Sequence, residues 1–311
     1  MSSTQDSRVR LAAFEFLEEQ VRLHGEVLPR DTLQTGFILD GTRVPLVGPQ
    51  GIFKPRLIPE IPFSITTAPS GPYDDSFGPD GLLRYRYRGN NPRHHENVAL
   101  RRAMEVRVPL AYFHGILRGK YLAVWPVYIV GDDPSSLTFR VAVDDARYMS
   151  GSMSDMRDRT AVSDSGTMAR RRYITATVKR RLHQQAFRAR VLRAYRSQCA
   201  MCRLRHDKLL DAAHIVPDSE PEGKPMVSNG IAVCKLHHAA YDKMFLAIRP
   251  DFLIRVRNDV LQEEDGPMLR HGLQGLHGQR IILPRDAALR PDPDLLARQY
   301  NRFRDLYRSV A

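Results

Sequence analysis

The pattern of apolar and polar residues in the first half of the chain predicts a mostly β domain with a few helices. Residues 6–23 place apolar side chains at helical spacing, which predicts an amphipathic helix. The following stretch, to about residue 80, is rich in Gly, Pro and β-branched residues, which favour short strands and turns. Further along, residues 97–106 predict another helix. Strands are expected on either side of it, at 82–88, 108–115, 121–130 and 137–143.

The second half of the chain follows a different pattern. Residues 150–169 are polar with many small side chains, and they predict a linker or an exposed loop. A long helix is expected at about 172–196, a compact segment with clustered Cys and His follows to about 256, and a last helix is expected at 295–309. Together these patterns predict an α+β chain in four parts, residues 1–150, 151–170, 171–262 and 263–311.

The composition is that of a folded protein. The 311 residues are 42% hydrophobic and 26% charged, which excludes a chain that is disordered throughout and suggests two domains. The longest apolar stretch, at about 121–130, is too short to cross a membrane, because a span takes about 20 apolar residues. The sequence also begins without an apolar signal region. We therefore expect a cytoplasmic protein that does not associate with membranes.

The positive charge is concentrated in one segment. The net charge is +12, and residues 170–210 hold thirteen Lys and Arg against one acid, Asp207, so this segment accounts for the whole excess. A solvated helix face is one explanation, but without interleaved acids the basic residues repel one another unless a polyanion neutralises them. We therefore expect phosphate binding along the long helix. The candidate residues are Arg171, Arg172, Lys179, Arg180, Arg181 and Arg188.

All three Cys of the chain fall in the compact segment, and their spacing predicts a metal site. Cys199 and Cys202 form a C-x-x-C pair, and Cys234 and His237 form a second pair of the same spacing, separated from the first by 31 residues. Such paired ligands are typical of closed structural zinc sites, in which a neutral imidazole can replace a thiolate. The sequence therefore predicts a Cys3His site for a structural Zn²⁺ ion. The alternative is three buried Cys beside an exposed His.

Three further polar residues, His214, Asn229 and His238, interleave with the zinc ligands, so folding around zinc must bring them close together. The segments in this region read CAMC, DAAHIVP, SNG and CKLHHAAYD. In order and spacing these segments resemble the HNH (ββα-metal) endonuclease family, and in particular its McrA-like members with a zinc-stapled core, over about residues 186–256. The resemblance implies a C-terminal zinc-stapled ββα-metal domain that hydrolyses phosphodiester bonds.

The resemblance also implies a role for each of these three residues. His214 would be the general base that takes a proton from water, and its ordinary pKa near 6.5 suits that task. Asn229 would hold the His214 ring in place through hydrogen bonds. His238 would bind a catalytic divalent ion, Mg²⁺, Mn²⁺, Ni²⁺ or Co²⁺, that stabilises the leaving oxygen. Each could instead be an ordinary core or surface residue, but all three in this register favour the catalytic interpretation.

The chain departs from the family at one position. Many members carry Asp or His just before the general base as a second ligand of the catalytic ion, whereas this chain has Ala213. Asp211 lies on the same side of the predicted strand as Ala213, and Asp242 lies one helical turn after His238. Both carboxylates are candidate ligands of the ion. For each of them the alternative is a local hydrogen bond.

The first domain has a candidate site of its own. Residues 84–107 contain seven Arg with interleaved Tyr, which suits nucleic-acid contact, although an edge strand with a polar face would have the same composition. This region resembles the SRA-like group of PUA-superfamily domains, which flip a modified base out of the duplex. The points of resemblance are a Tyr-Asp-Asp motif, an aromatic strand ending in Gly, an Asn-x-x-Leu helix and a Gly-x-Tyr turn. Trp125 is expected in the core. The resemblance implies a base pocket formed by Tyr73, Asp74, Asp75 and Tyr85.

A base-reading domain joined to an HNH nuclease predicts a modification-dependent restriction endonuclease. It would cut double-stranded DNA carrying modified cytosine, such as 5-methylcytosine or 5-hydroxymethylcytosine. We expect a homodimer because a double-strand cut needs two active sites, and the last helix could pack in that interface or on its own core. The alternatives are an HNH endonuclease of other specificity (a sequence-specific restriction enzyme or a toxin) and a zinc-stapled DNA-binding protein that does not cut. Ala213 favours the last of these, whereas His214, Asn229 and His238 oppose it.

Overall fold

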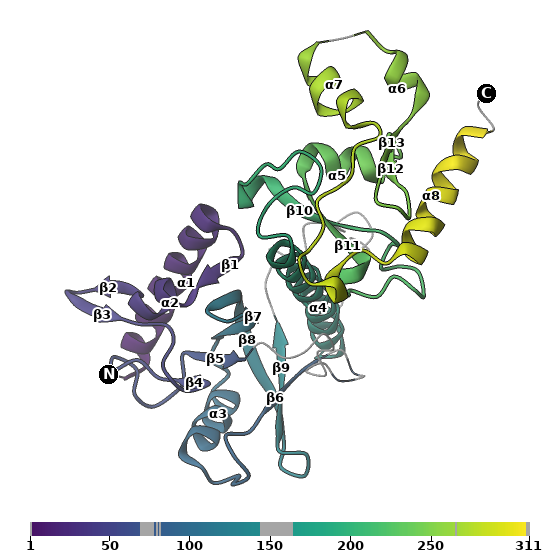
Figure 1. Ribbon diagram of the computed structural model, residues 1–311. Coiled ribbons are helices and arrows are strands. Elements are labelled where there is room, and N and C mark those ends of the chain that lie inside the picture. The colour runs from purple at the N-terminus through teal and green to yellow at the C-terminus, as the bar shows by residue number, and fades with distance from the viewer. Residues whose placement is uncertain are drawn as a thin grey trace. The chain divides into compact units, whose positions relative to one another are not determined.

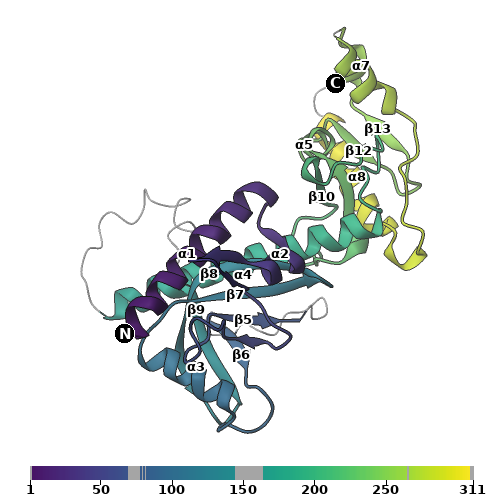
Figure 2. The same cartoon turned by 90° about the vertical axis from the view of Figure 1, so that its left-hand side faces the viewer.

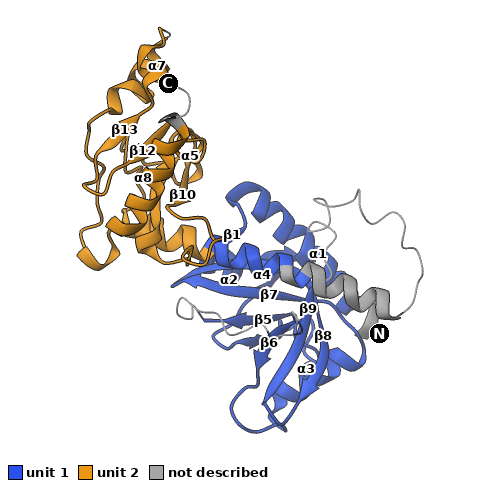
Figure 3. Ribbon diagram, turned by 90° about the vertical axis from the view of Figure 1, so that its right-hand side faces the viewer, with its two compact units in different colours: residues 1–185 blue, residues 186–311 orange. Residues whose placement is uncertain are grey.

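The computed structural model describes residues 2–68, 78, 80, 82–143, 164–264 and 266–308. It divides into two compact units, Met1–Gln185 and Ala186–Ala311, each with its own hydrophobic core (Figures 1 and 3). The division falls inside helix α4, Asp164–Ala194, so residues of this helix belong to both units. The described part of the chain includes no helix that combines the length and the apolar character of a membrane span.

Helix α4 is the long basic helix that the sequence predicts, but it begins earlier than expected. Residues 164–170, which the sequence assigns to the linker, are already helical. The rest of the expected linker, residues 151–163, lies outside the described residues. The difference has a simple origin, because the Asp and Ser residues that suggest a loop are also favoured at the start of a helix.

A seven-stranded mixed sheet forms the centre of the first unit (Figures 1 and 2). Neighbours in the sheet are antiparallel, except for the parallel pair of strands 64–67 and 110–117. Each stretch from residue 82 to 143 that predicts a strand forms one. In spatial order the strands are β4 (Ile52–Phe53), β5 (Ser64–Thr67), β7 (Leu110–Leu117), β8 (Lys120–Asp133), β9 (Thr138–Val143) and β6 (Leu83–Arg86), with β1 (Val27–Pro29) paired to β8.

Two helices lie on opposite sides of this sheet, α1 (Ser2–His24) on one and α3 (His95–Glu105) on the other (Figure 2). Both helices are expected from the sequence. Leu17 of α1 belongs to the same buried cluster as Phe113 of β7 and Trp125 of β8. The prediction that Trp125 is a core residue is therefore confirmed.

A short helix, α2 (Arg30–Thr35), lies in the stretch where the sequence predicts only strands and turns, and a hairpin of β2 (Phe37–Leu39) and β3 (Thr42–Val44) follows it. Pro29 precedes the helix in an extended conformation, and Gly36 ends it with φ of 62°, in the left-handed region that favours glycine. The Gly and Pro residues that suggest turns are thus the residues that bound this helix.

The second unit contains the strand–strand–helix arrangement that the resemblance implies. β10 (Leu210–His214) and β11 (Gly230–Cys234) form an antiparallel hairpin, and α5 (Lys235–Asp242) follows directly. The last helix, α8 (Pro293–Arg308), buries Leu296 in the core of this unit, so it packs on its own unit rather than standing free. The unit also contains the hairpin of β12 (Leu246–Ile248) and β13 (Ile254–Val256), the helices α6 (Asn258–Gln262) and α7 (Pro267–Gly272), and short 3-10 helices.

Candidate active site

The four predicted zinc ligands come together in the second unit. The ligand atoms of Cys199, Cys202, Cys234 and His237 all lie within 4.8 Å of one another. The Sγ atoms of Cys202 and Cys234 are 3.9 Å apart, and His237 Nδ1 lies 3.4 Å from Cys199 Sγ and 3.2 Å from Cys234 Sγ. Two sulfur ligands of a tetrahedral zinc ion, each about 2.3 Å from the metal, are separated by about 3.8 Å. The group therefore fits a structural zinc ion.

The surrounding backbone sets the orientation of these ligands. The first Cys pair lies in the turn after α4, which the Ala200 N–H anchors by donating to the Ala232 carbonyl of β11 at 2.7 Å. Cys234 ends β11, and His237 lies in the first turn of α5. His237 Nε2 lies 2.8 Å from the carbonyl of Gly272, to which it can only donate. This bond leaves Nδ1 without a proton and able to bind the metal.

His214, the predicted general base, is the last residue of β10. Its ring stacks on Phe187 of α4, with the ring centroids 3.9 Å apart and the planes 12° from parallel. Gly230 of β11 pairs with His214, and a Cβ atom there would lie 2.8 Å from the Phe187 ring, so the glycine makes room for this stack. His214 Nε2 is buried and has no hydrogen-bond partner among the described residues. Burial lowers the pKa of His214 below 6.5, so the ring is neutral at pH 7 and can accept a proton.

Asn229 lies directly before β11, and its buried side chain holds the backbone that follows His214. Its Oδ1 accepts from the Val216 N–H at 2.9 Å, and its Nδ2 donates to the carbonyls of Val216 at 2.9 Å and Lys224 at 3.1 Å. The Ile215 N–H also donates to the Asn229 carbonyl at 3.0 Å. Asn229 is therefore placed to fix the chain on both sides of the loop that joins β10 to β11.

Changing Asn229 to Asp is expected to destabilise the second unit and to slow catalysis. The carboxylate still accepts from Val216 N–H, but it can no longer donate to the buried carbonyl of Val216 or to the partly buried carbonyl of Lys224. Leaving a buried group unsatisfied costs about 1–3 kcal/mol. Thermal unfolding and the cleavage rate would both be measured. Asn258→Asp, at an exposed position at the start of α6, makes the same chemical change and serves as the control. Equal stability of the two variants would contradict the positioning role.

His238, the predicted ligand of the catalytic ion, lies in α5 between two carboxylates. Its Nδ1 is 3.3 Å from Asp211 Oδ2, and its Nε2 is 3.3 Å from Asp242 Oδ2. The hydrogen bond with Asp211 raises the pKa of His238 above 6.5. Both of the carboxylates that the sequence offers in place of a ligand at Ala213 thus lie beside His238.

The surroundings of His238 suit a divalent cation in their donor chemistry. Adjacent ligands of an octahedral ion with bonds of about 2.1 Å are separated by about 3 Å, close to both nitrogen–oxygen distances. Burial by itself would raise the pKa of Asp211, but hydrogen bonds with His238 and with Lys235, at 2.7 Å, hold it well below 3.8, so this carboxylate stays ionised. Asp242 is more exposed and ends α5. His238 with Asp242 is therefore the pair more open to an ion.

Three of these candidates line one pocket of about 300 Å³, whereas Asn229 and Asp211 are not among its lining residues. His214, His238 and Asp242 contribute from the hairpin and α5, and Gln299 and Arg302 contribute from α8. The sequence did not predict the last two, because they lie far along the chain from the Cys/His segment. The one sequence signal for them is a pair of Arg spaced by four in α8, opposite in charge to the acidic loop after His214.

The six predicted phosphate-binding residues all lie in α4, in different environments. Arg181 Nη1 lies 2.7 Å from Glu26 Oε1, and Arg188 Nη2 donates to the backbone carbonyls of residues 207 and 210 at 2.7 Å and 2.8 Å. These two side chains therefore bind groups of the protein itself. Lys179 is half-buried and Arg180 is exposed. For Arg171 and Arg172 the structure describes the helical backbone but not the side chains.

Most of the predicted base pocket lies outside the described residues, namely Tyr73, Asp74 and Asp75. Tyr85, in β6, is buried, and its hydroxyl lies 3.4 Å from the Thr66 carbonyl. The neighbouring Arg86 and Arg88 are exposed, in keeping with strand alternation. The stretch therefore presents its Arg to solvent and its Tyr to the interior.

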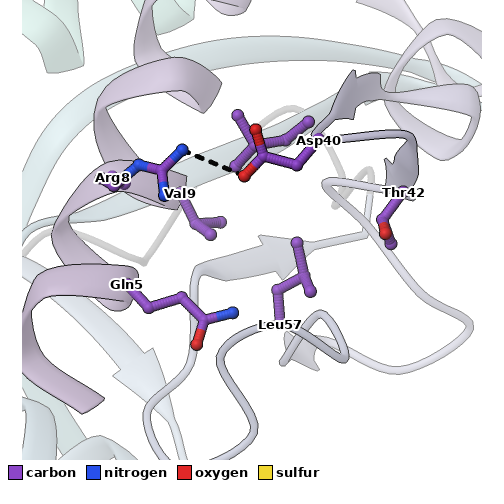
Figure 4. Close-up of a pocket in the computed structure, with 7 residues that line it drawn as sticks. Gln5, Arg8, Val9, Asp40, Thr42 and Leu57 are labelled. Atoms are coloured by element: carbon purple, nitrogen blue, oxygen red, sulfur yellow. Dashed lines mark hydrogen bonds and ion pairs between the residues drawn. The ribbon is translucent and has the colours of Figure 1, made fainter. Parts of the chain in front are cut away.

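A second pocket, of about 360 Å³, lies in the first unit between α1 and the β2–β3 hairpin (Figure 4). Arg8 and Asp40 form an exposed ion pair in it, at 3.0 Å, with Gln5, Thr42 and Leu57 nearby. Its lining residues include no His or Cys and no buried polar atom that lacks a partner. The chemistry of the described residues therefore points to the pocket around His214.

The match to a known protein family agrees with this assignment of the second unit. Residues 199–249 match the family model described as HNH endonuclease. No curated protein matches the chain. Among solved structures, a modification-dependent TagI restriction endonuclease is 14% identical with a TM-score of 0.30, over 78% of this chain and 82% of that one. The type IV phosphorothioation-dependent restriction endonuclease ScoMcrA is 16% identical with a TM-score of 0.23, over 82% of this chain but only 51% of that one, so the chain spans about half its length. The family match and the ββα geometry together show that the chain contains an HNH endonuclease domain.

Proposed function

We propose that the protein hydrolyses phosphodiester bonds in double-stranded DNA that carries modified cytosine. The observation that supports cleavage is the pocket in which His214 lies together with His238 and Asp242, with the His214 Nε2 unpartnered among the residues that the structure describes. A zinc module that only binds DNA has no need of this constellation. The proposal of a modified substrate does not rest on the two solved structures, because their TM-scores are below 0.5. It rests on residues of the first unit.

In this proposal His214 removes a proton from the attacking water. Burial keeps the ring neutral at pH 7, and the stack on Phe187 fixes its plane. Asn229 holds the backbone after His214. His238 and Asp242, with Asp211, would hold a divalent ion such as Mg²⁺, Mn²⁺, Ni²⁺ or Co²⁺. When bound, such an ion stabilises the negative charge that develops on the phosphate and the leaving oxygen.

The first unit is proposed to read the modified base. It is a compact unit with its own core, and the zinc ligands and HNH residues all lie outside it. Arg86, the last residue of β6, and Arg88, just after the strand, are exposed and would neutralise DNA phosphates. Tyr85 on the buried side would join Tyr73, Asp74 and Asp75 around a flipped base. We also propose that two copies act together, since a cut through both strands needs two active sites.

Cleavage is expected of plasmid DNA that contains 5-methylcytosine or 5-hydroxymethylcytosine, and not of the same plasmid without modification. Nicking and linearisation would be followed on agarose gels with Mg²⁺, Mn²⁺, Ni²⁺ or Co²⁺, and Tyr85→Ala would be tested beside the wild type. Equal cutting of modified and unmodified plasmid would support the nuclease activity and refute the proposal that the first unit reads a modified base. Binding without cutting under every metal would refute the nuclease and leave a zinc-stapled DNA-binding protein.

A further inference from the structure

Among the described residues that line the pocket around His214 and His238, Arg302 of α8 is the one with a fixed positive charge. Its side chain is 41% exposed. Both of its terminal nitrogens donate to the carboxylate of Glu220, each at 2.6 Å. Paired hydrogen bonds of this kind fix the plane of a guanidinium group. Arg302 is therefore both accessible and held in a defined orientation.

The attachment of α8 to the loop after His214 does not depend on Arg302 alone. Arg298, one turn earlier in α8, donates to Glu220 at 2.8 Å and to Glu222 at 2.6 Å. Arg298 thus connects the helix to both acids of the loop by itself. Arg302 is therefore not the sole connection between α8 and this loop.

The same pocket carries buried polar atoms that have no partner. Gln299 Oε1 and Tyr241 Oη are covered from solvent and make no hydrogen bond within the described part of the chain, as is also true of His214 Nε2. Among the described residues, the Gln299 Nε2 donates to Met244 Sδ, a weak acceptor at 3.5 Å, so little holds the amide in one orientation. Unpartnered buried groups are rare in folded proteins, and several in one pocket indicate that a polar ligand completes it.

We infer that Arg302 binds a phosphate oxygen of the cleaved DNA strand in the HNH pocket and that Glu220 positions it. This inference deepens the proposed function and rests on it. Cleavage requires an anionic phosphodiester beside His214, but the side of the pocket formed by Asp242 and Asp218 is negative and would repel it unless a cation is bound there. Arg302 supplies the positive side. A guanidinium suits a phosphate through both its charge and its planar set of donors.

Changing Arg302 to Gln is expected to lower kcat/KM by about 10-fold to 100-fold, as for loss of a charged hydrogen bond. The substrate is the plasmid that the wild type cuts. The slope of log affinity against log salt, measured with a fluorescent duplex of the same sequence, should become shallower by about 0.9. Glu220→Gln keeps the charge of Arg302 and leaves Arg298 bound to Glu222, so its DNA affinity should equal or exceed that of the wild type. Its kcat should fall, because the paired bonds that orient the guanidinium are lost. Arg304→Gln removes the same charge from an exposed position of α8 and is the matched control.

Two results would overturn the inference while the nuclease stands. If Arg302→Gln and Glu220→Gln lose activity and melting temperature together, the ion pair is only a clamp between helix and loop. If Arg302→Gln changes kcat/KM and the salt dependence no more than Arg304→Gln does, the change reflects only the lower positive charge of the protein. Failure of the wild type to cut any DNA would overturn the proposed function itself, and the inference with it.

Discussion

Replacing His214 by Ala is expected to slow DNA cleavage by about 10²-fold to 10⁴-fold, the usual contribution of a general base. The variant should keep its zinc and its fold, because the His214 side chain binds no zinc ligand and its Nε2 holds no hydrogen bond among the described residues. Single-turnover nicking of a supercoiled plasmid would give the rate. His206→Ala changes an exposed His in the same unit and should cut at the wild-type rate. A His214 variant that cuts normally would remove this residue from the mechanism.

The pH profile of the wild type gives an independent test of the same role. The neutral form of His214 is the active one, so the rate should rise with pH through the pKa of this residue. Burial lowers that pKa, and the midpoint of the rise should therefore lie below pH 6.5. The His214 variant should lack this part of the profile. A rise centred at or above pH 6.5 that persists in the variant would belong to another group.

Local spacing explains why the chemistry of the second unit could be predicted from sequence. Two residues separate Cys199 from Cys202, and two separate Cys234 from His237, so each zinc pair is fixed by its own short segment. The hairpin register then places His214 opposite Gly230, next to Asn229. The order of residues along the chain thus already contained most of the geometry around His214.

Contacts between distant segments could not be predicted in this way. Phe187 stacks on His214 from α4 and carries no spacing signal. Arg302 reaches the pocket from far along the chain, and its spacing of four from Arg298 does not indicate which site it joins. Charge counting has the same limit. A run of Arg in α4 predicts phosphate contact for each member, but Arg181 pairs with Glu26 and Arg188 donates to backbone carbonyls. Only the tertiary structure distinguishes a basic side chain that is free to bind phosphate from one that the protein uses.

Removal of zinc is expected to unfold the second unit and to leave the sheet of the first unit intact. The ligands connect the turn after α4, the end of β11 and the first turn of α5, and Cys199 and Cys234 are themselves buried in the core. Zinc binding contributes an apparent ~10–16 kcal/mol in small zinc domains, which is as large as the ~5–15 kcal/mol stability of a whole domain. The first unit contains no Cys and does not depend on the ion.

This expectation separates a structural zinc ion from a catalytic one. A strong chelator, or Cys199→Ser, should abolish amide-exchange protection in β10, β11 and α5 but not in β7 and β8, and metal analysis should find one zinc per chain in the wild type. His206→Gln, in the same segment but outside the cluster, should keep both zinc and protection. Cleavage should disappear together with the fold, because His214 ends β10 and His238 lies in α5, although no zinc ligand lines their pocket. Loss of cleavage with full protection in β10 and α5 would instead show that the Cys3His ion takes part in the reaction itself.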